Sequence, residues 1–117
     1  MGAKAMDSAT VNREYVYSRL ANDPDLREIV EMFVEEMPGR VASILEQLRA
    51  ADWEGLRRSA HQLKGAAGSY GFDPISPSAG KVEAAIRDSE PETRIRETVD
   101  ELIDLCTRAR CGAAEEQ

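Results

Sequence analysis

The chain has 117 residues, of which 42% are hydrophobic and 32% charged, a composition that suits one folded domain and argues against disorder throughout. With 22 acidic and 15 basic residues the net charge is −7, which disfavours nucleic acid as a partner because phosphate backbones repel an anionic protein. Nothing approaches the ~20 apolar residues of a membrane span, so we expect a cytoplasmic protein with no membrane partner.

The N-terminal region is predicted to hold little regular structure. Residues 1–10 are small and polar without periodicity, which indicates a disordered segment. A short first helix is predicted after them, with Val11, Tyr15 and Leu20 along one side. Asn22, Asp23 and Pro24 then form a helix-start signal, a capping side chain followed by a proline.

A long amphipathic helix is predicted from about residue 24 to residue 50. Its apolar side chains recur every three or four residues and form one stripe: Leu26, Ile29, Val30, Phe33, Met37, Val41, Ile44, Leu45 and Leu48. Pro38 removes one backbone donor inside this helix. Because the stripe keeps its register across Pro38, we predict a kink and no break.

Three more helices follow. Asp52 is predicted to cap a helix over residues 53–71 that Gly71 closes, with Trp53, Leu56, Ala60, Leu63, Ala67 and Tyr70 as its stripe. Because of the prolines around it, the next helix is predicted to start late, with Ser76 as cap and Pro77 as first residue. The segment 89–92 is typical of a capping box that opens a last helix reaching about residue 110.

These elements predict an all-α fold, because no run alternates with period two. The expected architecture is an antiparallel up-and-down four-helix bundle over residues 11–110, with the short extra N-terminal helix across one end. Residues 111–117 are expected to form a flexible tail. Cys106 is expected in the core and Cys111 to be incidental, since two cysteines without a nearby histidine predict neither a disulfide framework nor a zinc site.

The residues suited to chemistry lie on the helix predicted over residues 53–71. His61 follows the core position Ala60 and is rotated ~100° from it on a helix, so it lies beside the core and partly exposed. Gly65 and Gly68 share its row, although each glycine inside a helix costs ~1 kcal/mol. Their absent side chains would let a bulky partner reach the imidazole; close helix packing is the alternative explanation.

Basic residues gather around this histidine in an otherwise acidic chain. Arg57, Arg58 and Lys64 flank His61, and a local positive field suits a negatively charged adduct or partner. A solvated helix face with ordinary mixed charges is the competing interpretation.

His61 is the only histidine, which limits its roles. Its angular position disfavours a buried structural role, the lack of nearby ligands disfavours a metal site, and no nucleophile motif supports a hydrolase. A nucleophilic imidazole that accepts a phosphoryl group remains, with the neighbouring cations offsetting the added charge.

The run from His61 to Phe72 resembles the motif of histidine phosphotransfer (HPt) domains of two-component phosphorelays. That motif is His-x-x-Lys-Gly with a further glycine ten residues after the histidine, and Lys64, Gly65 and Gly71 fill these places. Val82 and Glu83 stand where the family usually has Leu-Glu, and Asp52 matches the acidic start of the helix.

The resemblance implies a helical phosphocarrier and no self-sufficient enzyme. His61 would accept a phosphoryl group on Nε2 from a receiver-domain phospho-aspartate or a histidine kinase and pass it to another receiver. Two origins of the chain stay open: a free-standing protein, or a domain of a hybrid histidine kinase. Lys64 would contact the phosphoryl oxygens, Gly65 would clear the docking surface, and Glu83 would orient the ring. Arg87 joins these residues as a further candidate for the docking surface.

The resemblance implies response-regulator receiver domains as partners. The chain is expected to bind them as a monomer. The chain lacks a glycine-rich nucleotide loop, so no cofactor is expected, and Mg²⁺ would sit on the receiver only. Two other functions stay open: a non-phosphorylated helical adaptor that docks a signalling partner, and a histidine-dependent phosphatase or hydrolase.

Overall fold

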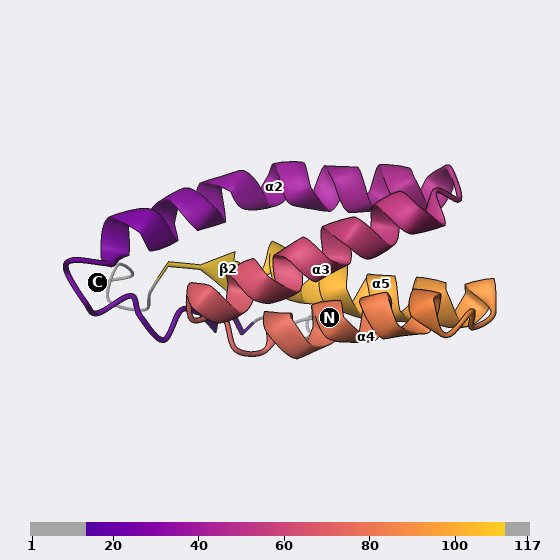
Figure 1. The fold of residues 1–117 in the computed structure, drawn as a ribbon. Coiled ribbons are helices and arrows are strands. Elements are labelled where there is room, and N and C mark those ends of the chain that lie inside the picture. The colour runs from indigo at the N-terminus through magenta and orange to yellow at the C-terminus, as the bar shows by residue number, and fades with distance from the viewer. Residues whose placement is uncertain (1–13, 112–117) are drawn as a thin grey trace, which may run out of the picture.

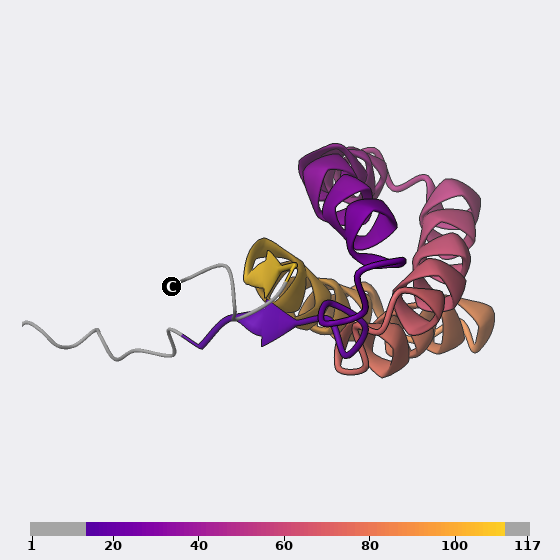
Figure 2. The ribbon, with the colours of Figure 1, turned by 90° about the vertical axis from the view of Figure 1, so that its left-hand side faces the viewer.

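The computed structural model describes residues 14–111 and contains four helices and a pair of short strands within that range. The elements are β1 (Val16–Tyr17), α2 (Arg27–Arg49), α3 (Trp53–Ser69), α4 (Ile75–Arg87), α5 (Glu92–Thr107) and β2 (Ala109–Arg110). In Figure 1 the chain reverses direction from each helix to the next. Figure 2, viewed toward the helix ends, shows the four helices around a common centre. The described residues are mostly helical, as the prediction of an all-α fold requires, and the two short strands depart from that prediction.

The core lies where the apolar stripes of the four helices meet. Fully buried side chains come from every helix, and the largest are Phe72, Ile44, Leu56, Leu63, Ile75, Leu102, Val30, Val82 and Val99. Two members of the predicted α2 stripe are exposed: Ile29 and Leu45 are 42% and 43% exposed. At ~100° per residue these two positions fall at opposite edges of the stripe, so the buried face of α2 is narrower than predicted.

Helix α2 begins later than predicted and is continuous. Residues 24–26 form a turn, and the Oδ1 atom of Asp23 accepts a hydrogen bond from the backbone N–H of Asp25 at 2.9 Å. The helix then runs through Pro38 to Arg49, so the prediction that Pro38 does not break it is confirmed. The size of the kink stays a prediction.

The predicted start of α3 and its closure by Gly71 are confirmed, although the helix ends at Ser69, two residues before the predicted limit. The Asp52 side chain accepts from the backbone N–H of Gly55 at 3.0 Å and caps the N-terminus. Gly71 follows the helix with φ +82°, a left-handed conformation that glycine adopts without steric cost. A β-carbon at Gly71 would lie 2.8 Å from Ser18 Oγ, so the site also excludes a side chain.

The predicted starts of the last two helices are wrong. Helix α4 begins at Ile75, because Pro74 already has helical dihedrals (φ −70°, ψ −26°) and Pro77 falls in the first turn, where its missing N–H is not needed. No capping box forms before α5: Ser89 adopts φ +55° in the preceding turn, and Pro91 is the cap residue without a side-chain hydrogen bond.

The predicted N-terminal helix is also wrong over residues 14–20; residues 11–13 lie outside the described range. Val16 and Tyr17 pair in parallel with Ala109 and Arg110, and the predicted last turn of α5 is strand β2 instead. The β-branched and aromatic side chains of residues 15–17 favour extended backbone. The strand is anchored because Ser18 Oγ donates to the Tyr70 carbonyl at 2.5 Å.

The two cysteines are both buried. Cys106 is 2% exposed and burial raises the pKa of its thiol to about 12, consistent with the predicted core position. Cys111 is 5% exposed beside β2, so the prediction of an incidental residue in a flexible tail is wrong at this position. The predicted disordered segment 1–10 and the rest of the tail, residues 112–117, lie outside the described residues. None of the four helices combines the length and apolarity needed to cross a membrane.

Candidate functional site

His61 lies on the outer face of α3. Its side chain is 62% exposed, whereas the preceding residue, Ala60, is fully buried. One step of ~100° along the helix separates the two positions. The structure therefore places the imidazole beside the core, in the angular position that the sequence predicts.

A carboxylate from the neighbouring helix holds the ring. The Nδ1 atom of His61 lies 2.8 Å from Oε2 of Glu83, which α4 contributes. The Glu83 side chain is only 12% exposed, so it meets the ring from below the surface. A hydrogen bond from Lys64 and a second from His61 lower the pKa of Glu83, against the opposing effect of burial.

Besides His61, two basic side chains of α3 lie close to the Glu83 carboxylate. The ammonium of Lys64 lies 3.0 Å from Oε1, and a guanidinium nitrogen of Arg57 lies 4.0 Å from Oε2. Positions 57, 61 and 64 are spaced by four and three, which brings their side chains to one side of the helix. The sequence predicts this convergence, and the 2.8 Å contact between Glu83 and His61 is the one that the family resemblance implies.

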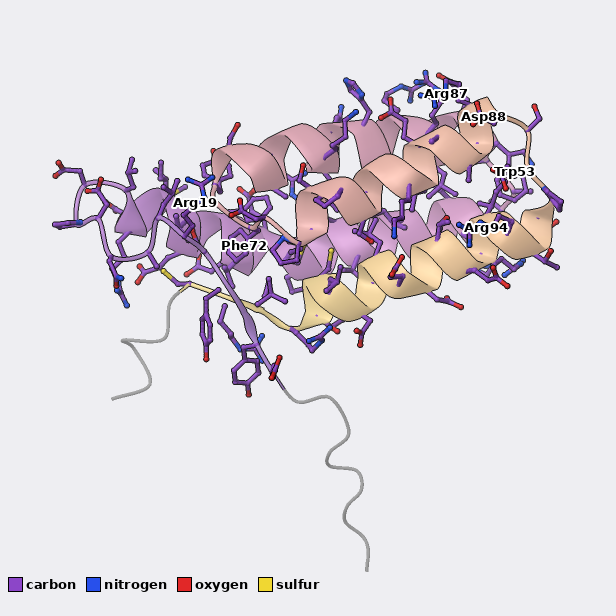
Figure 3. The ribbon with its side chains drawn as sticks, turned by 90° about the horizontal axis from the view of Figure 1, so that it is seen from below. Arg19, Trp53, Phe72, Arg87, Asp88 and Arg94 are labelled. Atoms are coloured by element: carbon purple, nitrogen blue, oxygen red, sulfur yellow. The ribbon has the colours of Figure 1, made fainter. Side chains whose placement is uncertain are left out.

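Two other predicted basic residues contact different carboxylates. Arg58 lies 3.7 Å from Glu54, which also pairs with Arg57 at 2.7 Å. Arg87 lies 3.4 Å from Asp88, and Figure 3 shows both near Trp53 at the end of the bundle where α4 gives way to α5. The interactions found for Arg87 do not include His61, and its place in a phosphoryl environment stays a prediction.

The two glycines of the histidine row have different surroundings. A β-carbon at Gly65 would meet nothing within 4 Å, so this position is open to solvent. A β-carbon at Gly68 would lie 3.5 Å from Ser76 Oγ of α4. Gly65 therefore fits the predicted clear surface, while Gly68 also serves the approach of α4.

Two residues of α4 next to Lys64 were missed by sequence reasoning as site residues. Ser76 Oγ donates a hydrogen bond to the backbone carbonyl of Lys64 at 2.9 Å, and a β-carbon at Gly80 would lie 3.2 Å from Lys64 Cδ. A glycine inside a predicted helix was the available signal. Within residues 14–111 no three histidine, cysteine or acidic side chains are grouped to hold a metal ion.

One of three comparisons with known proteins identifies a family that agrees with this geometry. A family model described as Hpt domain matches residues 28–111, which cover α3, α4, α5, β2 and all of α2 except Arg27. A search of curated proteins found no match, and a search of solved structures found none either. Since the matched range is well over half of the chain, this protein belongs to the Hpt domain family.

Proposed function

We propose that this chain is a phosphocarrier of a two-component phosphorelay and that His61 carries the phosphoryl group on Nε2. Membership of the Hpt family supports a phosphotransfer role in two-component signalling. The observation that carries the assignment to His61 is its 2.8 Å contact between Nδ1 and Glu83 on a ring that is 62% exposed. Nδ1 is thereby hydrogen-bonded to a buried carboxylate, while the rest of the ring remains accessible to solvent and to a partner.

The contact sets the tautomer of the ring. The lowered pKa of Glu83 keeps it ionised, and an ionised carboxylate can only accept hydrogen bonds. Nδ1 of His61 therefore carries the hydrogen, and in the neutral imidazole the free lone pair lies on Nε2. No hydrogen-bond partner for that nitrogen is found among residues 14–111, so the lone pair is free to attack.

The proposed step is a reversible exchange of one bond to phosphorus. The Nε2 lone pair attacks the phosphorus of a receiver's aspartyl phosphate, a P–N bond forms, and the P–O bond to the aspartate breaks. The electron pair of that bond leaves with the aspartate as its carboxylate, while the Nδ1 proton stays on the Glu83 hydrogen bond. The reverse exchange with a second receiver delivers the group and restores the neutral ring.

Positioning and charge neutralisation account for most of phosphoryl-transfer catalysis. Lys64 follows His61 by about one helical turn and its side chain is 42% exposed, so its ammonium is available to the phosphoryl oxygens. Arg57 lies one turn before His61 and is 36% exposed. Mg²⁺ and the acidic pocket are assigned to the receiver partner, so the chain is a carrier and not an enzyme by itself.

The receiver is proposed to dock on the exposed row that contains His61 and Gly65. Both positions are exposed, and the absent side chain at Gly65 leaves space above α3. Exchange of partners in a relay favours a one-to-one complex with an interface at the low end of the ~1,200–2,000 Å² range. The chain would act as a monomer, since a dimer that covered His61 would block transfer.

The experiment is transfer of labelled phosphate from a phosphorylated receiver to the wild type and to His61→Gln, followed by acid treatment. The wild type is expected to acquire acid-labile label, and the variant none, because glutamine keeps similar bulk but lacks a nucleophilic nitrogen. Circular dichroism of both proteins controls for folding. Acid-labile label on folded His61→Gln would disprove the assignment, since His61 is the only histidine. A wild-type protein that binds receivers but never acquires label would favour the alternative function, a helical adaptor that is not phosphorylated.

A further inference from the structure

We propose that Gly80 is a positioning residue: its missing side chain leaves room for the stem of Lys64 to lie over α4 and reach the phosphoryl site. This inference rests on the proposed function of His61 and Lys64. Gly80 lies inside α4, which spans Ile75–Arg87. A glycine there destabilises the helix relative to alanine, so its presence has to be explained by something other than helix formation.

Three residues of α4 contact three parts of Lys64 in sequence. Ser76 Oγ donates to the Lys64 backbone carbonyl at 2.9 Å. The Cδ atom of Lys64 lies 3.2 Å from where a β-carbon of Gly80 would stand. The Lys64 ammonium then lies 3.0 Å from Oε1 of Glu83. Because positions 76, 80 and 83 are spaced by four and three, they form one row along α4.

The row fixes the path of a side chain that is otherwise free. A lysine stem has four carbons and many rotamers, and here it passes over α4 instead of extending into solvent. The distance of 3.2 Å is shorter than ordinary van der Waals contact. A β-carbon at position 80 would therefore push the stem by a few tenths of an ångström, and a larger side chain would displace it.

Displacement would also move the ammonium away from His61. His61 and Lys64 share the Glu83 carboxylate, through Oε2 and Oε1. This sharing holds the ammonium beside the ring that would carry the phosphoryl group. A side chain larger than a methyl group at position 80 would turn Lys64 outward and leave the phosphoryl group with a less ordered cation.

The test substitutes Gly80 by alanine and by leucine, with the same pair of changes at Gly39 as control. Gly39 lies inside α2 and a β-carbon there would meet nothing within 4 Å. Alanine at Gly39 should raise the melting temperature by about 4–8 °C without changing transfer. Gly80→Ala should keep the melting temperature at or above that of the wild type, because the neighbouring lysine stem is flexible, yet transfer should slow.

Gly80→Leu should slow transfer from a phosphorylated receiver by about fivefold, the scale of one partly exposed ion pair. When Gly80→Leu is combined with Lys64→Ala, the transfer rate should be the same as in Lys64→Ala alone, because the lysine side chain that leucine would displace is absent. A loss of the same size in both backgrounds would overturn the proposal. A transfer rate in Gly80→Leu equal to that of the wild type would also overturn the proposal.

A second readout does not depend on phosphate. The hydrogen bond from Lys64 is the largest cause that lowers the pKa of Glu83, so NMR titration of the Glu83 carboxyl carbon should show a higher pKa in Gly80→Leu and an unchanged one in Gly39→Leu. An unchanged Glu83 pKa in folded Gly80→Leu would overturn the proposal. If His61 proved to carry no phosphate, this titration would still decide whether Gly80 positions Lys64.

Discussion

The two faces of α3 differ in what their residues do. The inner face is aliphatic and closed: Leu56, Ala60, Leu63 and Ala67 are each at most 1% exposed. The outer face carries His61 with a side chain that is 62% exposed. The closed face fixes the rotation of the helix, and that rotation sets the direction of the imidazole. The proposed function of this helix therefore depends on the packing of its inner face, although His61 itself takes no part in that packing.

The carboxylate of Glu83 connects the packed interior to the exposed outer face of α3. Glu83 belongs to the buried face of α4, yet it contacts the exposed His61 and Lys64. Its burial makes a fixed position possible, and the cations around it offset the cost of burying a charge. The outer face is thus ordered by a group that the core holds in place.

The largest effect should come from opening the inner face. Leu63→Ala removes a side chain that is 1% exposed and is expected to lower the free energy of unfolding by about 2–5 kcal/mol. The neighbouring exposed Gln62→Ala should stay within ~0.5 kcal/mol. Urea unfolding measures both. Equal losses for the two variants would mean that the faces do not differ as described.

A smaller effect, about tenfold on transfer, is expected from Gly65→Arg. A side chain at Gly65 has open space around it, so the variant should fold while the arginine obstructs the receiver. Gly39→Arg, at an equally open position on α2, should leave transfer unchanged. The measurement is receiver affinity and transfer rate beside thermal unfolding. A collapse of stability with unchanged affinity would show that Gly65 serves packing.

Gly68→Arg is expected to combine both effects. Its new side chain would start 3.5 Å from Ser76 Oγ, so it should weaken the contact between α3 and α4 as well as docking. A melting temperature below that of Gly65→Arg would separate the two glycines. Equal melting temperatures would place Gly68 on the open surface with Gly65.

Helical periodicity explains what could be predicted from the sequence. The outward position of His61 and the cap at Asp52 depend on residues a few positions apart, so local spacing is sufficient. Strand β1 was missed because Val16 pairs with Ala109 from the far end of the chain. The contact between Lys64 and Gly80 was missed for a related reason, since the rotation and distance between two packed helices are set by the whole core.

Under the proposed function, Lys64→Ala is expected to slow transfer by about fivefold, because it removes one partly exposed cation near the phosphorylated ring while the receiver would supply its own neutralising charges. Lys81→Ala is the matched control: Lys81 is an exposed lysine of α4 whose partner is Glu101, at 3.7 Å. Rates of label transfer at fixed receiver concentration measure the difference. Complete loss of transfer in Lys64→Ala would mean that this lysine has a larger role than charge neutralisation.

The smallest expected effect concerns pH. The hydrogen bond from Lys64, with help from His61, lowers the pKa of Glu83 in the folded chain. A carboxyl whose folded pKa lies below its unfolded value, ~4.3 for glutamate, stabilises the fold above that pH, and the contribution is lost as pH falls through the folded pKa. Relative to Glu83→Gln, the wild type should therefore lose stability in acid.

For one partly exposed set of charges the change should be less than ~1 kcal/mol. It is measured by urea unfolding of the wild type and Glu83→Gln between pH 7 and pH 3. Glu101→Gln, which removes an exposed carboxylate of α5, controls for the general effect of one negative charge. A difference between wild type and Glu83→Gln that stays constant over this range would show that Glu83 titrates alike in the folded and unfolded chain. The outer face would then be ordered by packing alone, without the shared carboxylate.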